Sequence, residues 1–160
     1  MKAVIFQTQG EDFGISIEHV VSIEKVLDLK PIPNLPDYVK GVMPIRGELV
    51  PVIDVSCLFK KIENNELEKA KIITVQTDEL TAGLLVSEAK EILELEQEQL
   101  KLLPIGAGAS SKWFSSIAMK DSRLITLVNP ASFIGTLEAL DDIKSELLTL
   151  NIEENEKASI

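Results

Sequence analysis

Proline and glycine divide this 160-residue chain into short segments, and their spacing limits the fold more than any other feature. Pro31, Pro33 and Pro36 all fall within residues 27–38, where each fixes the backbone φ angle and removes a hydrogen-bond donor. We therefore expect a loop there. The apolar segments between such breaks are short and often alternate with polar residues, a pattern typical of half-buried strands. The sequence predicts an all-β fold with little helix.

Residues 42–55 form the clearest local unit. Two apolar runs flank the dipeptide Gly47-Glu48, which predicts a β-hairpin with a tight turn. Gly47 can adopt the positive φ angle that such a turn requires. Because Pro44 and Pro51 cannot donate to a strand ladder, each is expected at a sheet edge, a strand start or a bulge.

The other expected elements follow the same pattern. Short strands are predicted at residues 3–8, 13–17, 20–26, 71–77, 82–86, 91–96, 113–119 and 124–128, and a loop at 97–112. Asn129 and Pro130 are typical of a helix cap and first turn, and apolar residues at three- and four-residue steps continue to Leu147. Residues 151–160 are expected to be a disordered tail.

A polar connection at residues 60–71 separates two strand-rich halves of similar length. The close spacing of short strands predicts small barrels or a sandwich, in two halves at about 14–70 and 71–130 that form a single domain over residues 1–137, with the N-terminal strand open to being shared. Each half is small for an independent hydrophobic core, so the halves should pack together or share strands. Residues 138–160 would form a C-terminal helix and acidic tail.

The charge balance limits the classes of partner. The chain has 26 acidic and 16 basic side chains, a net charge of −10, which argues against binding to nucleic acid or an anionic membrane. Most of the acidic excess lies in residues 88–99 and 138–157, which we interpret as solvated surfaces. No apolar run is long enough for a targeting signal or a membrane span, so we expect a cytoplasmic protein without direct membrane insertion.

Residues able to carry out chemistry are scarce. The chain has one histidine and one cysteine, and it lacks a glycine-rich phosphate-binding motif. We interpret His19 as a surface residue in a strand and Cys57 as a buried, inert thiol. Asp54 is interpreted as a hydrogen-bonding turn residue rather than half of a catalytic carboxylate pair. The sequence therefore predicts a binding protein with no metal or cofactor.

Arg46 is one of only two arginines and lies at the tip of the predicted hairpin. Two interpretations stay open at this point. Arg46 is either an exposed turn residue or a guanidinium that pairs with a carboxylate, within this chain or on a partner. Glu24 is the first acid to test because it ends an apolar, strand-like run.

Several segments follow the pattern of a known family. They are Phe13-Gly14-Ile15-x-Ile17-x-x-Val20, Ile32-Pro33-x-x-Pro36-x-Tyr38-Val39-Lys40-Gly41-Val42, the run from Ile45 to Asp54, and the later segments Gly83–Val86, Leu103-Pro104 and Leu124–Val128. On these residues the chain resembles the CheW family, the coupling proteins of bacterial chemotaxis, over roughly residues 3–137. The block from 32 to 54 is the most specific part of the resemblance.

The resemblance implies a fold of two five-stranded, SH3-like barrels packed around a shared apolar seam, with a C-terminal helix. It implies a non-catalytic adaptor that binds the regulatory domain of the histidine kinase CheA and the cytoplasmic tip of a methyl-accepting chemoreceptor. Other copies of the chain in array rings are a further partner that the resemblance suggests. Two alternatives stay open: a scaffold for a different receptor–kinase pathway, and a small β-barrel enzyme.

The resemblance also assigns two partner-binding surfaces. The kinase-binding residues would be Val20, with Ile15 and Ile17 in support. The receptor-binding residues would be Gly41, Ile45, Arg46, Gly47, Leu84, Leu85 and Val86.

Three positions depart from the family pattern. Ser22 stands where the family often has a glutamate that pairs with the arginine matched by Arg46, and Ser87 and Ser116 replace a frequent Asp and Gly. Because Glu24 is two residues further along the same face of a strand, we predict that it pairs with Arg46 instead.

Overall fold

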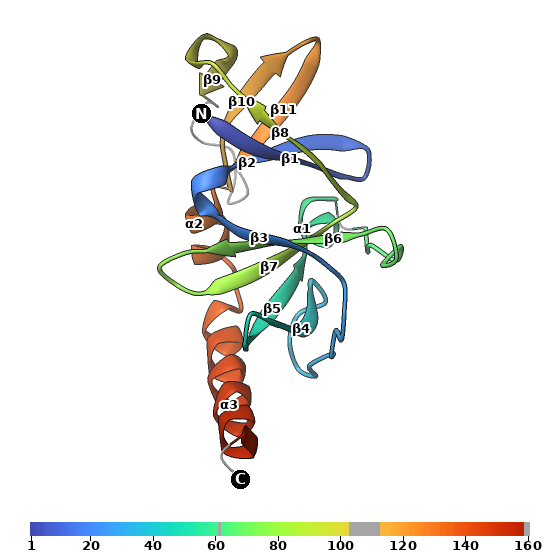
Figure 1. Cartoon of the computed structure of the whole chain (residues 1–160), viewed down its shortest axis with the longest axis vertical. Helices are drawn as coiled ribbons and strands as arrows, with labels where there is room; N and C mark the ends of the chain where they lie inside the picture. Colours follow the sequence, from blue (N-terminus) through green and yellow to red (C-terminus); the bar gives the residue numbers. More distant parts are fainter. Residues whose placement is uncertain (61, 103–112, 159–160) are drawn as a thin grey trace.

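The computed structural model describes residues 1–60, 62–102 and 113–158, in two β-sheets with short helices (Figure 1). The expected Leu103-Pro104 segment and most of the loop at 97–112 lie outside the described residues. The strands are β1(Lys2–Thr8), β2(Glu11–Ser16), β3(Val20–Lys25), β4(Val39–Ile45), β5(Glu48–Asp54), β6(Lys71–Gln76), β7(Thr81–Val86), β8(Glu88–Glu94), β9(Leu100–Leu102), β10(Phe114–Lys120) and β11(Arg123–Val128). The helices are η1(Ile17–His19), α1(Val55–Lys60), η2(Gln97–Gln99), α2(Pro130–Gly135) and α3(Leu140–Ala158).

The strands form one six-stranded sheet, in the order β8-β1-β2-β11-β10-β9, and one five-stranded sheet, in the order β3-β6-β7-β5-β4. The first sheet has one strand more than predicted because the short strand β9 pairs with β10. His19 lies in the short helix η1 between the sheets rather than in a strand. The described strands confirm a mainly β fold of two SH3-like units.

The two sheets do not divide near residue 70 as the sequence suggested. Strands β6 and β7 (residues 71–86) join β3–β5, while β1 and β2 join the later strands. The reason is long-range pairing: β6 pairs antiparallel with β3, and β7 pairs parallel with β5. The N-terminal strands therefore belong to the same sheet as the C-terminal strands. The polar connection after α1 links β5 to β6, two strands of the same sheet, and does not separate the two units.

Alternation along the strands separates the apolar side chains into three buried clusters. One lies inside each sheet unit, and one lies in the seam between them. On β1, for example, Ala3 and Ile5 belong to the interior of the six-stranded unit, whereas Val4 and Phe6 belong to the seam. The seam also holds a cluster of aromatic rings in stacked, tilted and edge-to-face contact, Phe13, Phe59, Trp113, Phe114 and Phe133.

The hairpin of β4 and β5 has the predicted tight turn, but its central residues are Arg46 and Gly47, one position earlier than expected. Both central residues have positive φ angles, 52° at Arg46 and 85° at Gly47, which is the geometry of a type I′ turn. Pro44 lies on β4, the edge strand of its sheet. Pro51 faces Val42 of β4, and the pairing of β5 with β7 begins only at Val52.

The C-terminal region is helical further than predicted. Asn129 caps α2 by accepting a hydrogen bond from the Ser132 amide at 3.3 Å, as expected. Helix α2 ends at Gly135, and α3 begins at Leu140 and runs to Ala158. The prediction of a disordered tail at 151–160 is therefore wrong for the residues described. The Asn151 side chain holds this helix to the barrel by accepting a hydrogen bond from the Leu49 amide at 3.2 Å. The first part of α3 packs on the protein through Ile143, which is buried in the seam cluster, and in Figure 1 the C-terminal end of the helix projects beyond the sheets.

Candidate functional site

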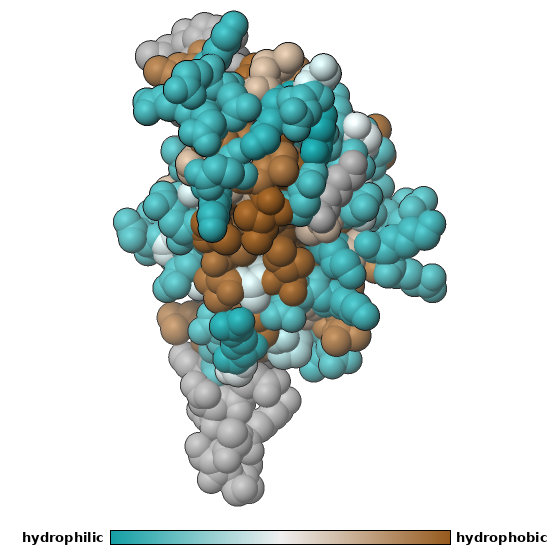
Figure 2. All heavy atoms as spheres, turned by 45° about the horizontal axis from the view of Figure 1, so that its top comes forward, coloured by the Kyte–Doolittle hydropathy of each residue, from teal (hydrophilic) through white to brown (hydrophobic). Residues whose placement is uncertain are grey.

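An apolar surface runs along η1 and β3. Ile17, Val21 and Ile23 are 40%, 36% and 44% exposed, and Val20 is half-buried against the seam cluster. Strand β3 is an edge strand with β6 as its one neighbour, so its second side is open for pairing. Figure 2 shows apolar side chains gathered in a band down the middle of the face that it views. We call Ile17, Val20, Val21 and Ile23 the η1–β3 surface.

The η1–β3 surface agrees in part with the predicted kinase-binding residues. Val20 and Ile17 are accessible, but Ile15 is fully buried in the seam cluster and cannot contact a partner directly. Val21 and Ile23 were not among the contact residues predicted from the sequence. Their exposure depends on β3 being an edge strand, which only the tertiary pairing reveals.

Most of the predicted receptor-binding residues are core residues. Leu84, Leu85 and Val86 lie on β7 in the middle of a sheet and are at most 1% exposed. A partner cannot reach these side chains, because β7 has neighbours on both sides and both of its faces are covered. Their apolar character reflects burial.

Gly41 and Ile45 are also structural. Ile45 is buried in the interior cluster of the five-stranded unit. Gly41 is buried with φ 145°, and the backbone of Lys30 crosses over it so closely that a side chain has no room. Of the predicted receptor-binding residues, Arg46 and Gly47 at the hairpin tip are exposed.

Among the described residues, Arg46 has no ion pair, and the predicted pair with Glu24 is wrong. Arg46 lines a groove of about 220 Å³ together with Thr74 of β6. The residue opposite Thr74 is Ser22, whereas Glu24 lies opposite Ile72, two residues further along. Two residues of a strand span about 7 Å, which displaces Glu24 from the groove.

Thr74, which lines the groove, and Ser22, its pairing partner on β3, both carry hydroxyls without hydrogen-bond partners among the described residues. The hydroxyls of Ser22 and Thr74 are buried and have no hydrogen bond in the structure. Ser22 stands at the sequence position where the resembled family often has a glutamate. The serine at position 22 therefore leaves both the Arg46 guanidinium and this pair of hydroxyls unmatched.

We expect the substitution Ser22→Glu to restore an ion pair with Arg46. The coupling free energy should be about 1 kcal/mol, as for a partly exposed pair. A double-mutant cycle of Ser22→Glu and Arg46→Ala in urea unfolding measures this coupling. Equal effects of Ser22→Glu with and without Arg46 would contradict the proposed proximity.

Asp54 has the hydrogen-bonding role that the sequence predicted. Its carboxylate is completely buried at the start of α1 and accepts hydrogen bonds from the amides of Cys57, at 3.3 Å, and Asn64, at 2.9 Å. The Lys40 ammonium lies 3.8 Å from the same carboxylate and also pairs with Glu63. Asp54 thus ties α1 and the following connection to β4 and β5.

The Cys57 thiol should react slowly with alkylating reagents. Burial raises its pKa above the ordinary value of 9.0, and the neighbouring Asp54 carboxylate raises it further. Because only the thiolate reacts, iodoacetamide should label the folded protein more slowly than the urea-unfolded chain at pH 8, and the rate should keep rising above pH 9. A rate that levels off below pH 9 would show that the thiol is activated.

The described part of the chain provides neither a cluster of metal ligands nor a membrane-spanning helix. No group of three or more His, Cys, Asp or Glu side chains there could hold a metal ion. Among the same residues, no helix is both long and apolar enough to cross a membrane.

Comparison with known proteins gives a consistent result. A family model described as the CheW-like domain matches residues 2–138. The chain is 25% identical over 129 residues to the chemotaxis protein CheW of Bacillus subtilis, covering 80% of this chain and 83% of that protein. It is 28% identical over 131 residues to the chemotaxis protein CheW of Treponema pallidum, covering 79% and 77% of the two chains.

A solved structure shares the fold. The scaffolding protein TtCheW of Thermoanaerobacter tengcongensis superimposes with a TM-score of 0.74 at 24% identity, covering 83% of this chain and 86% of that one. The match of the family model extends from β1 through α2, and so includes both sheets and the η1–β3 surface. This chain belongs to the CheW-like domain family.

Proposed function

We propose that this protein is a non-catalytic adaptor that couples methyl-accepting chemoreceptors to the histidine kinase CheA. Membership of the CheW-like family supports the role of a chemotaxis coupling protein. The observation that carries the proposal is the η1–β3 surface, an apolar patch on an open sheet edge. Such a surface suits reversible contact with another folded protein. As an adaptor at the cytoplasmic tip of a receptor, the protein would work in the cytoplasm.

The η1–β3 surface is the proposed contact for the CheA regulatory domain. The exposed edge of β3 can pair with a strand of another barrel, while Ile17 and Ile23 supply apolar area beside it. Val20 lies at the base of this surface and packs inward against the seam. We keep Val20 and Ile17 as kinase-binding residues, with Ile15 as buried support.

The Arg46–Gly47 hairpin tip is the proposed contact for the receptor. The Arg46 guanidinium has no ion pair among the described residues, so its planar donors are available for a carboxylate on the receptor. Ile45, Leu84 and Leu85 support this tip indirectly, because they pack in the buried clusters on the two faces of its sheet.

Substitution of the η1–β3 surface tests the kinase contact. Ile17→Glu and Val20→Glu should each abolish pull-down of the CheA regulatory domain because a carboxylate would be desolvated at the interface. Leu148→Glu is the matched control, since Leu148 is a 65%-exposed apolar residue on α3. Val20 is half-buried, so circular dichroism must show a native fold. Retained pull-down by both folded variants would remove this surface from the proposal.

Substitution of Arg46 tests the receptor contact. Arg46→Ala should weaken binding to a receptor cytoplasmic fragment about tenfold while leaving binding to the CheA regulatory domain unchanged. Equal loss of receptor binding and of CheA binding would assign Arg46 a general structural role. Assembly of a ternary complex with chemotaxis CheA and receptor fragments supports the proposed pathway, whereas failure with properly folded fragments would favour a scaffold of another receptor–kinase pair.

A further inference from the structure

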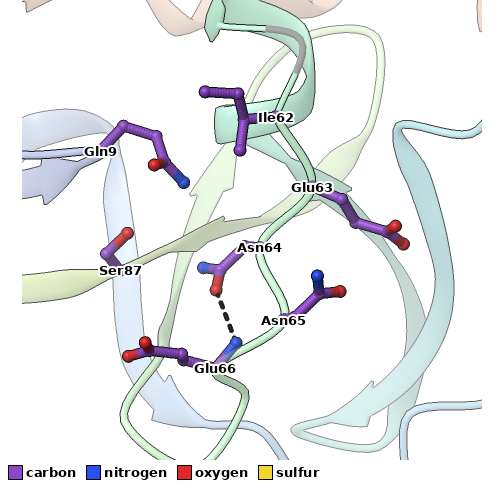
Figure 3. Close-up of a pocket in the computed structure, with 7 residues that line it drawn as sticks. All are labelled: Gln9, Ile62, Glu63, Asn64, Asn65, Glu66 and Ser87. Carbon is purple, nitrogen blue, oxygen red and sulfur yellow. Dashed lines mark hydrogen bonds between the residues drawn. The ribbon is translucent and has the colours of Figure 1, made fainter.

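A polar cavity of about 330 Å³ (Figure 3) shares no lining residue with the η1–β3 surface or the hairpin tip. It is formed where the connection after α1, residues 62–66, passes Gln9 of the β1–β2 turn and Ser87 between β7 and β8. The cavity therefore lies where both sheets contribute to one wall. None of its residues has a role in the proposed kinase or receptor contacts.

Hydrogen bonds hold the walls of this cavity in place. The Gln9 side-chain amide nitrogen donates to the Ser56 hydroxyl at 2.8 Å. The main-chain amide of Asn64 donates to the buried Asp54 carboxylate at 2.9 Å. The side-chain oxygen of Asn64 accepts from the main-chain amide of Glu66 at 3.2 Å, the bond drawn in Figure 3. A cavity fixed in this way requires little ordering when a ligand enters.

Asn64 presents an unused donor to this cavity. The residue is only 6% exposed, and its side-chain amide nitrogen, Nδ2, has no hydrogen-bond partner in the described part of the structure. Figure 3 shows the Asn64 side chain directed toward the space between Gln9 and Ser87. Buried side-chain amides nearly always have partners, so this position calls for an acceptor atom from a ligand.

The rest of the lining calls for a cation. Glu63 and Glu66 both line the cavity, and Glu63 is already paired with Lys40. The Glu66 carboxylate has no ion pair with any residue that the structure describes, and the Gln9 side-chain oxygen accepts no hydrogen bond there. Two carboxylates disfavour an anionic ligand and favour a positively charged donor.

We propose that this cavity binds an arginine side chain of a protein partner, together with the adjoining main-chain carbonyl. The guanidinium donors would reach Glu66 and the Gln9 oxygen, which a planar fork of donors can do at once. The main-chain carbonyl beside the partner's arginine would accept a hydrogen bond from the side-chain nitrogen Nδ2 of Asn64. The inference does not depend on which receptor or kinase the protein couples.

Titration of the full-length, ¹⁵N-labelled protein with N-acetyl-L-arginine N-methylamide tests the proposal. The probe should shift the amide signals of residues 62–66 and Ser87 and the side-chain amide signals of Gln9 and Asn64. The citrulline analogue has the same shape without the charge, and n-butylguanidinium has the charge without a carbonyl. Each should bind at least about fivefold more weakly. Equal binding of the citrulline analogue, or shifts confined to other residues, would overturn the proposal.

Two glutamate variants on the same connection sharpen the test. Glu66→Gln should weaken binding of the arginine probe at least about fivefold, because it removes the unpaired carboxylate. Glu68→Gln removes one negative charge from an exposed residue that does not line this cavity, and it should leave affinity unchanged. Both side chains are exposed, so both variants should keep the native spectrum. If Glu66→Gln and Glu68→Gln weaken binding of the arginine probe equally, the effect depends on net charge alone and the proposed site is wrong.

Discussion

Replacing Gly41 with alanine should lower the free energy of unfolding by about 3–5 kcal/mol, through backbone strain and the loss of hydrogen bonds. A Cβ atom at this position would lie 2.1 Å from the Lys30 carbonyl oxygen, a distance that the backbone cannot keep. Relief of this clash requires breaking the two hydrogen bonds between Lys30 and Val42, at 2.9 and 2.8 Å. The φ angle of 145° adds strain for any residue with a side chain. Urea unfolding measures the loss.

The same substitution at Gly135 is the control. A Cβ atom at Gly135 meets nothing within 4 Å, and this residue ends α2 without a positive φ angle. Gly135→Ala should therefore be neutral or stabilise the protein by up to about 1 kcal/mol. If Gly41→Ala unfolds at the same urea concentration as the unchanged protein, the Lys30 crossing does not exist as described.

Replacing Asp54 with alanine should cost about 3–5 kcal/mol of unfolding free energy, as is typical when one partner of a buried charge network is removed. The change leaves the Cys57 and Asn64 amides without their acceptor in a completely buried position. It also leaves the largely buried Lys40 ammonium with Glu63 alone. Thermal unfolding should show a melting temperature lower by about 6–20 °C for a chain of this size.

An exposed aspartate provides the comparison for Asp54. Asp78 is exposed in the β6–β7 turn, and Asp78→Ala should change stability by less than about 0.5 kcal/mol. Asp54→Asn keeps an oxygen acceptor and should cost less than the alanine variant. Similar stability of all three variants would mean that Asp54 does not join α1 to the connection that follows it.

Local patterns predicted most elements because their causes are local. The type I′ hairpin follows from residues 46 and 47 and the apolar runs beside them, and the cap of α2 follows from Asn129 and Pro130. The run of four apolar residues in β1 is continuous because its two faces are buried in different clusters, Ala3 and Ile5 in one and Val4 and Phe6 in the other. The extent of α3 was missed because the acidic composition of residues 151–158 suits a solvated helix as well as a disordered tail.

The candidate site was only partly predictable because apolar sequence does not distinguish a contact surface from a core. The family pattern favoured Leu84, Leu85 and Val86 as contacts, but β7 has neighbours on both sides and buries all three. Glu24 and Ser22 share one face of β3 in any strand. Which of them stands next to Thr74 and Arg46 depends on the register with β6.

The short strands, the turns, the capped helix and the scarcity of chemically reactive residues can all be read from the order of the amino acids. The tertiary structure alone decided that β6 and β7 join β3–β5, that β3 is an open edge, and that Asn64 faces a cavity without a partner. The physical reason is the range of the interactions. Turns and caps depend on neighbours within a few residues, whereas strand partners and burial depend on contacts between residues far apart in the chain.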